Sequence, residues 1–311
     1  MLVLTEETTT AAPTFSNRGV HLDAQAVDEL RDSSSLRNDI VALRQRMQQD
    51  GYLFMRGLLT RDEVLEARRE ITRRMAEQGW LDPAYPAMDA IAVRARDASK
   101  FVPDILAKDN AALAKVLYAG PLMDFFRDFF GQPVRHFDYT WLRSIWPGPA
   151  NPSHCDIVYM GRGERERLFT AWTPLGDIDC ELGGLAILEG SHHNQRLKET
   201  YGQMDVDGYC VNKPDARGWG KVWGTGGHLK GHPDQIRRVV GGRWLTTSYR
   251  AGDVVIFGMF TVHMGLDNHS PNRIRLSSDS RYQPADTPAD ERWIGPNPIA
   301  HGPAGRRGRI C

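Results

Sequence analysis

Residues 151–160 read Asn-Pro-Ser-His-Cys-Asp-Ile-Val-Tyr-Met, and the rest of the chain is most simply interpreted as a scaffold around this stretch. A loop rich in Pro, Gly and Asn (146–153) precedes an apolar run that is typical of a short strand. Alternate side chains of a strand share a face, so we expect His154 and Asp156 to point together and Cys155 to point away. An imidazole beside a carboxylate supplies two of the three ligands in the 2-His-1-carboxylate triad that suits non-heme Fe(II).

The third ligand is expected on a distant strand, and His263 is the candidate. It follows the apolar run 254–257, which is typical of a buried strand. Simpler interpretations stay open: a His-x-Asp triplet is commonly a loop or a hydrogen-bonded pair, and His263 alone would be a buried histidine bonded to backbone. His192 and His193 are adjacent, so strand geometry would send them to opposite faces, and we predict them to be loop residues.

The composition is that of an ordinary globular protein. The chain has 311 residues, of which 41% are hydrophobic and 25% charged, and its formal net charge is +0. This balance excludes a global attraction to nucleic acid or to an anionic membrane, and no apolar run approaches the length of a membrane span. The chain has no CxxC pair, which favours a reduced, cytoplasmic protein over a disulfide scaffold. Its four cysteines are Cys155, Cys180, Cys210 and Cys311.

Helical patterns come first along the chain and strand patterns follow. Residues 1–20 are polar and aperiodic, and we expect a disordered or loosely docked arm there. Helical signals occur at 36–47 (capped by Ser33 to Ser35), 60–78 (opened by a capping box at Thr60), 110–118 and 121–130. Strand patterns occur at 134–145, 157–160, 168–173, 185–188, 254–257 and 274–282.

This order predicts a mainly β fold with flanking helices. We expect one domain over residues 21–311, with a helical jacket (about 33–131) on an antiparallel jelly-roll core (about 133–284). A jelly roll brings distant strands side by side, so His263 can meet His154, which lies 109 positions earlier. The poorly periodic stretch of about 194–247 is predicted to be a lid insertion over the pocket mouth.

Two arginines are candidates for binding a ligand beside the metal. Arg273 and Arg275 follow His263 and are expected on one strand face, where a bidentate cationic donor would suit a dicarboxylate co-substrate. A salt bridge or a solvated strand edge is the simpler explanation of each. We prefer Arg275, because it lies deeper in the strand while Arg273 follows a turn.

The candidate substrate residues come from two segments. Strand alternation would place Tyr139, Trp141 and Arg143 on one face, below the cavity. In the lid, Trp219 and Trp223 lie among lysines and arginines, a combination that could cover a flat or anionic substrate. A solvated loop whose charges only maintain solubility explains the lid equally well.

The order of these motifs resembles the phytanoyl-CoA dioxygenase family of Fe(II)/2-oxoglutarate oxygenases, from about Gly51 to about Pro284. The segments that carry the resemblance are His154-x-Asp156, AWTPL (171–175), GGL to GSH (183–192), AGDVVIF (251–257), His263 and 272–282. The resemblance implies a double-stranded β-helix, a cupin-like jelly roll in which His154, Asp156 and His263 hold Fe(II) and 2-oxoglutarate chelates the metal. It also implies that an arginine after the distal histidine binds the far carboxylate and that Trp172 lines that pocket. The family often has Gln where this chain has Cys155, at a position expected to face away from iron.

The resemblance implies that oxidation of a C–H bond of a small molecule is coupled to decarboxylation of 2-oxoglutarate by O2, giving succinate and CO2. Because Asp156 fills the carboxylate position, no metal site is left for halide, which favours hydroxylation or another oxidation over halogenation. Two other classes stay open: a cupin-like isomerase or lyase that uses no keto acid, and a non-catalytic binding protein on the same scaffold. The former would need neither arginine after His263, and an intact triad argues against the latter. The sequence names neither the substrate nor the oligomeric state.

Overall fold

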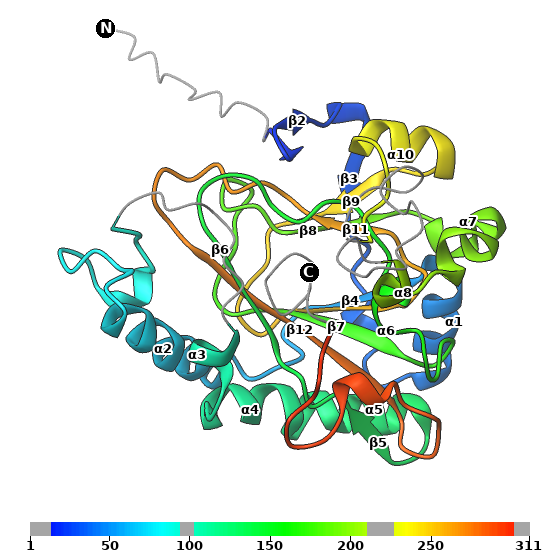
Figure 1. Ribbon diagram of the computed structural model, residues 1–311, viewed down its shortest axis with the longest axis horizontal. Coiled ribbons are helices and arrows are strands. Elements are labelled where there is room, and N and C mark those ends of the chain that lie inside the picture. Colours follow the sequence, from blue (N-terminus) through cyan, green and yellow to red (C-terminus); the bar gives the residue numbers. More distant parts are fainter. Residues whose placement is uncertain (1–13, 94–102, 210–226, 302–311) are drawn as a thin grey trace, which may run out of the picture.

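The computed structural model describes residues 14–93, 103–209 and 227–301. Two β-sheets form its centre, and helices α1, α2, α4 and α5 pack against the larger one (Figure 1). The α-helices are α1 (Ile40–Asp50), α2 (Arg61–Glu77), α3 (Pro103–Ala107), α4 (Ala111–Tyr118), α5 (Gly120–Phe130), α6 (Ile157–Met160), α7 (Gln195–Glu199), α8 (Val206–Tyr209) and α10 (Pro233–Val240). None of the helices in the described ranges is long and apolar enough to cross a bilayer.

The larger sheet has the order β4–β10–β7–β12–β5, with β6 also paired to β12, and all its pairings are antiparallel. Its strands are β4 (Tyr52–Met55), β5 (Val134–His136), β6 (Trp141–Ile145), β7 (Phe169–Pro174), β10 (Val254–Gly258) and β12 (Arg275–Pro284). The smaller sheet has the order β11–β8–β9–β3, in which only β3 and β9 run parallel. Its strands are β3 (Val27–Glu29), β8 (Leu185–Leu188), β9 (Trp244–Thr246) and β11 (His263–Gly265). This is the mainly β architecture with flanking helices that the sequence predicts.

Alternation along β12 gives the larger sheet one apolar face and one charged face. On the outer face, the ring of Tyr282 stacks on Phe126 of α5 with 4.3 Å between centroids. On the opposite face, Arg275, Asp279 and Arg281 are buried. Because buried charges are costly unless they are paired or used, this inner face marks the place where a site is expected.

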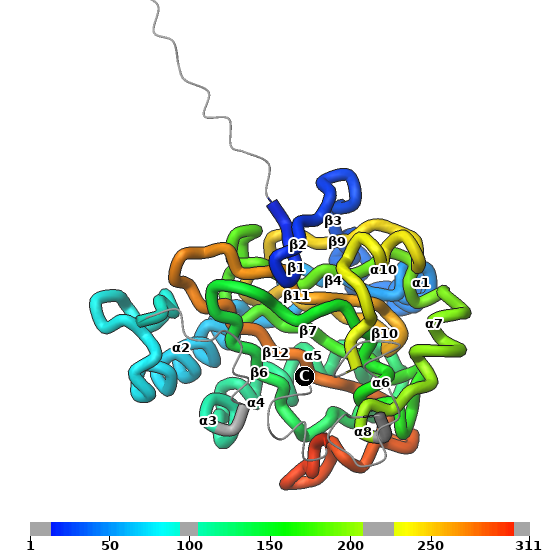
Figure 2. The backbone as a smooth tube through the Cα atoms, turned by 45° about the horizontal axis from the view of Figure 1, so that its top comes forward, coloured from blue at the N-terminus to red at the C-terminus, as the bar shows by residue number. Residues whose placement is uncertain are grey.

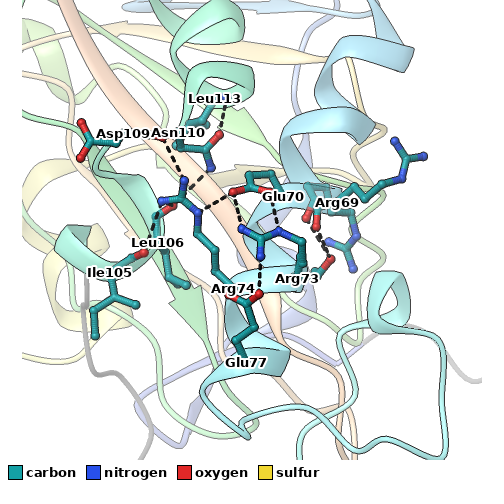
Figure 3. Close-up of polar contacts among 12 residues, drawn as sticks. Arg69, Glu70, Arg73, Arg74, Glu77, Ile105, Leu106, Asp109, Asn110 and Leu113 are labelled. Atoms are coloured by element: carbon teal, nitrogen blue, oxygen red, sulfur yellow. Dashed lines mark hydrogen bonds and ion pairs between the residues drawn. The ribbon is translucent and has the colours of Figure 1, made fainter.

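One arginine fastens α2 to the connection between α3 and α4 (Figure 3). The guanidinium of Arg74 donates to the backbone oxygens of Lys108 at 2.6 Å and Asp109 at 3.0 Å, and to Glu70 one turn earlier at 2.7 Å. Asn110 then caps α4, because its side-chain oxygen accepts a backbone N–H of the first turn at 3.0 Å. The helical layer therefore rests on polar contacts as well as on its apolar core.

The helix predictions hold except at two N-termini. Helices α4 and α5 match their predicted segments, and Gly131 ends α5 with a φ of 73°. Helix α1 begins at Ile40, because Asp39 is its cap, and residues 34–36 form a separate 3-10 turn. Thr60 is the N-cap of α2 but makes no side-chain capping bond, so the predicted capping box is wrong.

Two predictions about strands are wrong, and the predicted lid contains regular structure. Residues 157–160 form α6 instead of a strand, and the single strand predicted over 134–145 is two strands, β5 and β6. The described part of the predicted lid, about 194–247, contains α7, α8 and α10, and its last residues form β9 of the smaller sheet, so the lid stays a prediction. Residues 210–226 of that stretch lie outside the described residues.

Part of the predicted loose arm, residues 1–20, is docked. Ser16 and Asn17 form β1, which pairs with β2 (Val20–His21), and both residues of β1 are buried. The hydroxyl of Ser16 donates to Asp267 at 2.6 Å, and the amide of Asn17 donates to the carbonyl of Gly265 at 2.7 Å. Figure 2 shows this hairpin above β11, next to β3 and β9. The polar composition that predicted looseness instead serves these buried hydrogen bonds.

Candidate metal centre

A backbone bridge brings two histidines together from distant segments. The N–H of His154 donates to the carbonyl of His263 at 3.0 Å, and the reciprocal bond is also 3.0 Å long. His263 begins β11 of the smaller sheet, and His154 follows the loop 146–153. The centroids of the two rings lie 4.3 Å apart, so both imidazoles converge on one point.

Asp156 reaches the same point from a helix. It is the N-cap residue of α6 and has helical backbone angles (φ −67°, ψ −24°), and the N–H of Ile157 donates to the carbonyl of Met259 at 3.1 Å. The strand geometry predicted for His154 and Asp156 is therefore wrong, because the chain turns into α6 directly after Cys155. Cys155 does lie apart from the ligands, and its buried thiol donates to a backbone carbonyl 3.3 Å away.

The three side chains offer one set of ligand atoms. One atom of each lies within 4.8 Å of the others, and the Nε2 atoms of His154 and His263 are 3.8 and 3.6 Å from Oδ1 of Asp156. Their Nδ1 atoms lie 2.7 Å from the carbonyl of Pro152 and 3.0 Å from that of Thr261. A carbonyl oxygen only accepts, so Nδ1 carries the proton and the Nε2 lone pair is left for a metal. Two imidazoles and one carboxylate are a donor set that fits Fe(II).

Two donors hold the other oxygen of Asp156, and the sequence reasoning missed both. The hydroxyl of Thr170 donates to Oδ2 at 2.5 Å, and Nη2 of Arg281 donates to it at 2.9 Å. The guanidinium of Arg281 also lies over the ring of Trp141, 4.2 Å from its centroid, and 3.2 Å from the carboxylate of Asp279. With Oδ2 engaged, Oδ1 is the oxygen that faces the two histidines.

A signal for Arg281 was present in the sequence. The residues Arg275, Ser277, Asp279 and Arg281 alternate along β12, so the face assigned to the first extends to the last. His228 is also close to the centre, with its ring centroid 5.9 Å from that of His154, and no pattern in the sequence indicates it.

The surroundings hold the three groups in the protonation states that bind metal. Burial lowers the pKa of His154 well below its ordinary value, and burial likewise lowers the pKa of His263. Burial alone would raise the pKa of Asp156, but the positive charge of Arg281, helped by the neighbouring imidazoles and by the hydrogen bond from Thr170, outweighs it and holds that pKa well below its usual range. Neutral imidazoles and an ionised carboxylate are therefore the forms at neutral pH.

Arg273 and Arg275 lie in different environments, although both were expected on one strand face. Arg273 precedes β12, is about one third exposed, and pairs with Asp179 at 2.8 Å and Glu181 at 2.7 Å. Arg275 is buried, and its Nη1 donates to the backbone oxygens of Gly183 and Gly184. Within the described residues no carboxylate lies within 4 Å of Arg275, and its Nε has no hydrogen-bond partner. Burial lowers the pKa of Arg275 to about 10, so its charge is retained at neutral pH without an ion-pair partner among the described residues.

A cavity beside the triad contains several of the predicted residues. Arg143, Trp172 and Arg275 line it together with His154 and His263. The remaining side of the cavity is formed by Asn151, Gly184, Leu185, Phe257, Gly265 and Asp279.

The other predicted substrate residues are not among those that line this cavity. Tyr139 precedes β6, and its ring contacts Trp141 and Trp293 at 4.6 and 5.3 Å between centroids. Trp141 is fully buried beneath Arg281. Trp219 and Trp223 lie outside the described residues.

A family profile described as phytanoyl-CoA dioxygenase (PhyH) matches residues 47–277. Among curated proteins, 1-deoxypentalenic acid 11-beta-hydroxylase of Streptomyces exfoliatus is 27% identical over 263 residues, which cover 82% of this chain and 84% of the relative. The protein of the same name from Streptomyces arenae is 26% identical over 268 residues, with the same coverage.

Solved structures match over most of the chain. The non-heme alpha-ketoglutarate-dependent epimerase SnoN has a TM-score of 0.52 at 20% identity and covers 85% of this chain and 94% of its own. The carbocyclase SnoK has a TM-score of 0.52 at 19% identity and covers 86% and 89%. EctD from S. alaskensis has a TM-score of 0.51 at 17% identity and covers 93% and 90%. At these identities the likeness concerns the fold alone, and it confirms the predicted jelly roll.

Proposed function

The chain belongs to the phytanoyl-CoA dioxygenase family, and from this premise we propose that it hydroxylates a C–H bond of a small organic molecule. It is an iron- and 2-oxoglutarate-dependent oxygenase, so succinate and CO2 are the co-products. The observation that carries the proposal is the position of Arg275, whose uncompensated guanidinium lines the same cavity as His154 and His263.

We assign iron binding to His154, Asp156 and His263. Iron held there together with 2-oxoglutarate supplies the activation of O2 that oxidation of a C–H bond requires. The protein fixes the ligands beforehand: backbone carbonyls orient the two imidazoles, while Thr170 and Arg281 orient the carboxylate. Such pre-oriented ligands need little rearrangement when the metal binds.

We assign Arg275 as the residue that binds the distal carboxylate of 2-oxoglutarate. A buried cation without a counter-ion is costly, and a bound carboxylate would remove that cost by accepting from the guanidinium. Arg273 suits this role less well, because it has two carboxylate partners and lies at the surface. The indole of Trp172 and the apolar side chains of Leu185 and Phe257 line the cavity and exclude water from it.

On the substrate side, Arg143 is the candidate within the described residues. It lines the cavity, and it donates from Nε and Nη2 to Asp279 at 3.0 and 2.9 Å. We assign Tyr139 and Trp141 the role of supporting Arg281. Their rings pack against each other, and the guanidinium of Arg281 lies over the ring of Trp141. Trp219 and Trp223 remain proposed substrate residues of the lid.

The test measures succinate and the product in the same reaction. The purified full-length protein is given Fe(II), 2-oxoglutarate and O2, and small organic acids and alcohols are screened for stimulation of succinate formation. The product is then analysed by mass spectrometry after reaction under 18O2. We expect one labelled oxygen atom in the product and no turnover by the Asp156→Ala variant. A product isomeric with the substrate would show that the reaction is epimerisation and not hydroxylation. A product that has lost two hydrogens would show oxidative cyclisation.

A further inference from the structure

A second and larger cavity lies where Phe169 of β7 pairs with Gly258 of β10, and it shares no lining residue with the cavity beside the metal centre. Its volume is about 530 Å3, which falls in the range of roughly 300–1,000 Å3 that is usual for small-molecule sites. Thr170 of β7 faces the metal centre, where it bonds Asp156. The next residue back along the strand, Phe169, points to the opposite face and lines the second cavity. The two cavities have no lining residue in common, and nothing in the proposed reaction uses the second one.

Aromatic and thioether side chains form the apolar wall of this cavity. They come from α1, α5, β7 and the turn 258–261, near α7 (Figure 1). The apolar lining residues are Met47, Phe129, Phe130, Phe169, Met259 and Phe260. Phe169 contacts both Phe129 and Phe130, at 5.6 and 5.9 Å between centroids, so the wall is continuous.

Cations without acidic partners surround the same wall. Arg44, Arg165 and Lys198 all line the cavity, and in the described part of the chain none of them has a carboxylate within 4 Å. Arg165 and Lys198 lie over one ring, that of Phe260, at 5.6 and 5.2 Å from its centroid. The Nε of Arg165 is buried and has no hydrogen-bond partner.

The charge balance of the lining is positive. Besides these three cations, which lack a carboxylate partner in the described residues but of which Arg44 and Arg165 donate to neutral oxygens, Arg167 lines the cavity and lies 3.5 Å from Glu164. Glu166 is the one acidic residue among the lining residues, and it is exposed at the rim. Cations held over an aromatic ring beside an apolar wall complement a molecule with an anionic head and an apolar body.

We propose that this cavity is a binding site for an amphipathic carboxylate, separate from the metal centre. The carboxylate group lies between Arg165 and Lys198, where it accepts from both. The apolar body lies against Phe129, Phe130 and Phe169.

The probe for this site is decanoate, with decanol as the uncharged molecule of equal chain length. Binding to the full-length protein is measured by calorimetry in the presence of Mn(II) and 2-oxoglutarate. These two occupy the metal-site cavity and so compete with the probe for it. We expect decanoate to bind at least about tenfold more tightly than decanol, because only the carboxylate gains charged hydrogen bonds. Equal affinity for the two probes, or no decanoate binding at millimolar concentration, would overturn the proposal.

Substitutions locate the bound probe. The double variant Arg165→Gln/Lys198→Gln should weaken decanoate binding about tenfold or more and leave decanol unchanged. Arg196→Gln is the matched control, because Arg196 lies on α7 with Lys198 but does not line the cavity. If Arg275→Gln abolished decanoate binding and the double variant did not, the probe would occupy the metal-site cavity and the proposal would fail.

A third variant blocks the cavity without touching its charges. Gly258 lines the cavity, and a Cβ atom added there meets only the ring of Phe169, at an ordinary contact distance of 3.9 Å. A side chain at position 258 therefore has room at its Cβ atom, and the longer Gly258→Leu side chain should occupy the cavity and reduce binding of decanoate and decanol alike. If this variant does not fold, the Arg165 and Lys198 substitutions alone test the proposal. These two side chains are partly exposed, so their replacement should not prevent folding.

Discussion

The hydroxyl of Thr170 donates to Oδ2 of Asp156 at 2.5 Å, and it does so from the strand that runs through the middle of the larger sheet. Arg281, on the neighbouring strand, donates to the same oxygen. The carboxylate that faces the two histidines is therefore positioned by the sheet and not by α6, which Asp156 only precedes as the N-cap residue. This makes the sheet part of the metal centre.

Thr170→Val tests that relationship directly. The substitution keeps the shape of the side chain and removes one of the two donors to Oδ2, so Asp156 is less firmly held. Loss of such a supporting bond usually weakens metal binding by about 10–100-fold, and we expect about tenfold here because Arg281 remains. Mn(II) titration followed by electron paramagnetic resonance measures the affinity.

Thr173→Val is the matched control for this experiment. Thr173 is on the same strand, but it points to the other face and its hydroxyl has no hydrogen-bond partner. It should leave Mn(II) affinity unchanged. Equal affinities for the Thr170 variant, the Thr173 variant and the wild type would show that the 2.5 Å bond does not position the ligand.

The three ligand residues should be separable from the stability of the fold. We predict that His154→Ala, Asp156→Ala and His263→Ala each weaken metal binding by more than the roughly 100-fold limit of supporting residues, and each abolish turnover. The circular dichroism spectrum should stay native, because Arg281 keeps Asp279 as an ion-pair partner when Asp156 is removed. Full metal binding by any one of these variants would remove that residue from the set.

A surface network on α2 gives a prediction about pH. Glu70 accepts from Arg73 at 2.8 and 2.9 Å and from Arg74 at 2.7 Å, and these bonds lower its pKa from 4.5 to about 2. A carboxyl with a lower pKa in the folded state stabilises the protein above pH 4.5, and that stability is lost as the pH falls towards 2. Because the network is near the surface, its contribution is at most about 1 kcal/mol.

The measurement is urea unfolding of the wild type and of Glu70→Gln across this pH range. At pH 6 the variant should have a free energy of unfolding lower by about 0.5–1 kcal/mol, and the difference should shrink as the pH falls below 4.5. Glu66→Gln is the control, since among the residues that the structure describes Glu66 pairs only with the exposed Arg69. A difference that stays constant with pH would assign the effect to something other than the ionised carboxylate.

The fold was predictable where local chemistry determines it. Asn110 and Gly131 mark the start of α4 and the end of α5, because a side-chain cap and a left-handed glycine act within one helical turn. The same reasoning gave a wrong prediction for residues 157–160, which form α6 and not a strand. They are apolar and buried throughout, and a four-residue apolar run does not distinguish a strand from a buried helical turn.

In the candidate site, too, some residues could be predicted from local sequence and others could not. His154, Asp156 and His263 could be selected because their residue types and their place beside apolar runs are visible locally. The hydrogen bond from Arg281 to Asp156 joins residues that are 125 positions apart in the sequence. The pairing of β12 with β7 brings them together, and no local pattern indicates it. The environments of Arg275 and Arg273 also differ in a way that the sequence does not reveal. Asp179 and Glu181 form ion pairs with Arg273 at the turn and not with the buried Arg275.

That separation gives the prediction with the largest expected effect. Arg275→Gln removes the buried cation that we assign to the distal carboxylate of 2-oxoglutarate. Losing such a contact costs roughly 2–5 kcal/mol, so the concentration of 2-oxoglutarate needed for half-maximal succinate formation should rise by about two to three decades. Mn(II) affinity should stay near that of the wild type, because Arg275 makes no hydrogen bond to a ligand residue.

Arg273→Gln provides the comparison, since it changes the same residue type two positions away. Its guanidinium already binds Asp179 and Glu181 at the surface, so the substitution should cost at most about 1 kcal/mol of stability and leave the 2-oxoglutarate requirement unchanged. The reverse result, with a steep requirement in Arg273→Gln and none in Arg275→Gln, would move the carboxylate site to the turn. It would also require Arg273 to leave both acidic partners when the co-substrate binds. A buried guanidinium that already lacks a counter-ion needs no such exchange, and this difference is the physical reason for assigning Arg275.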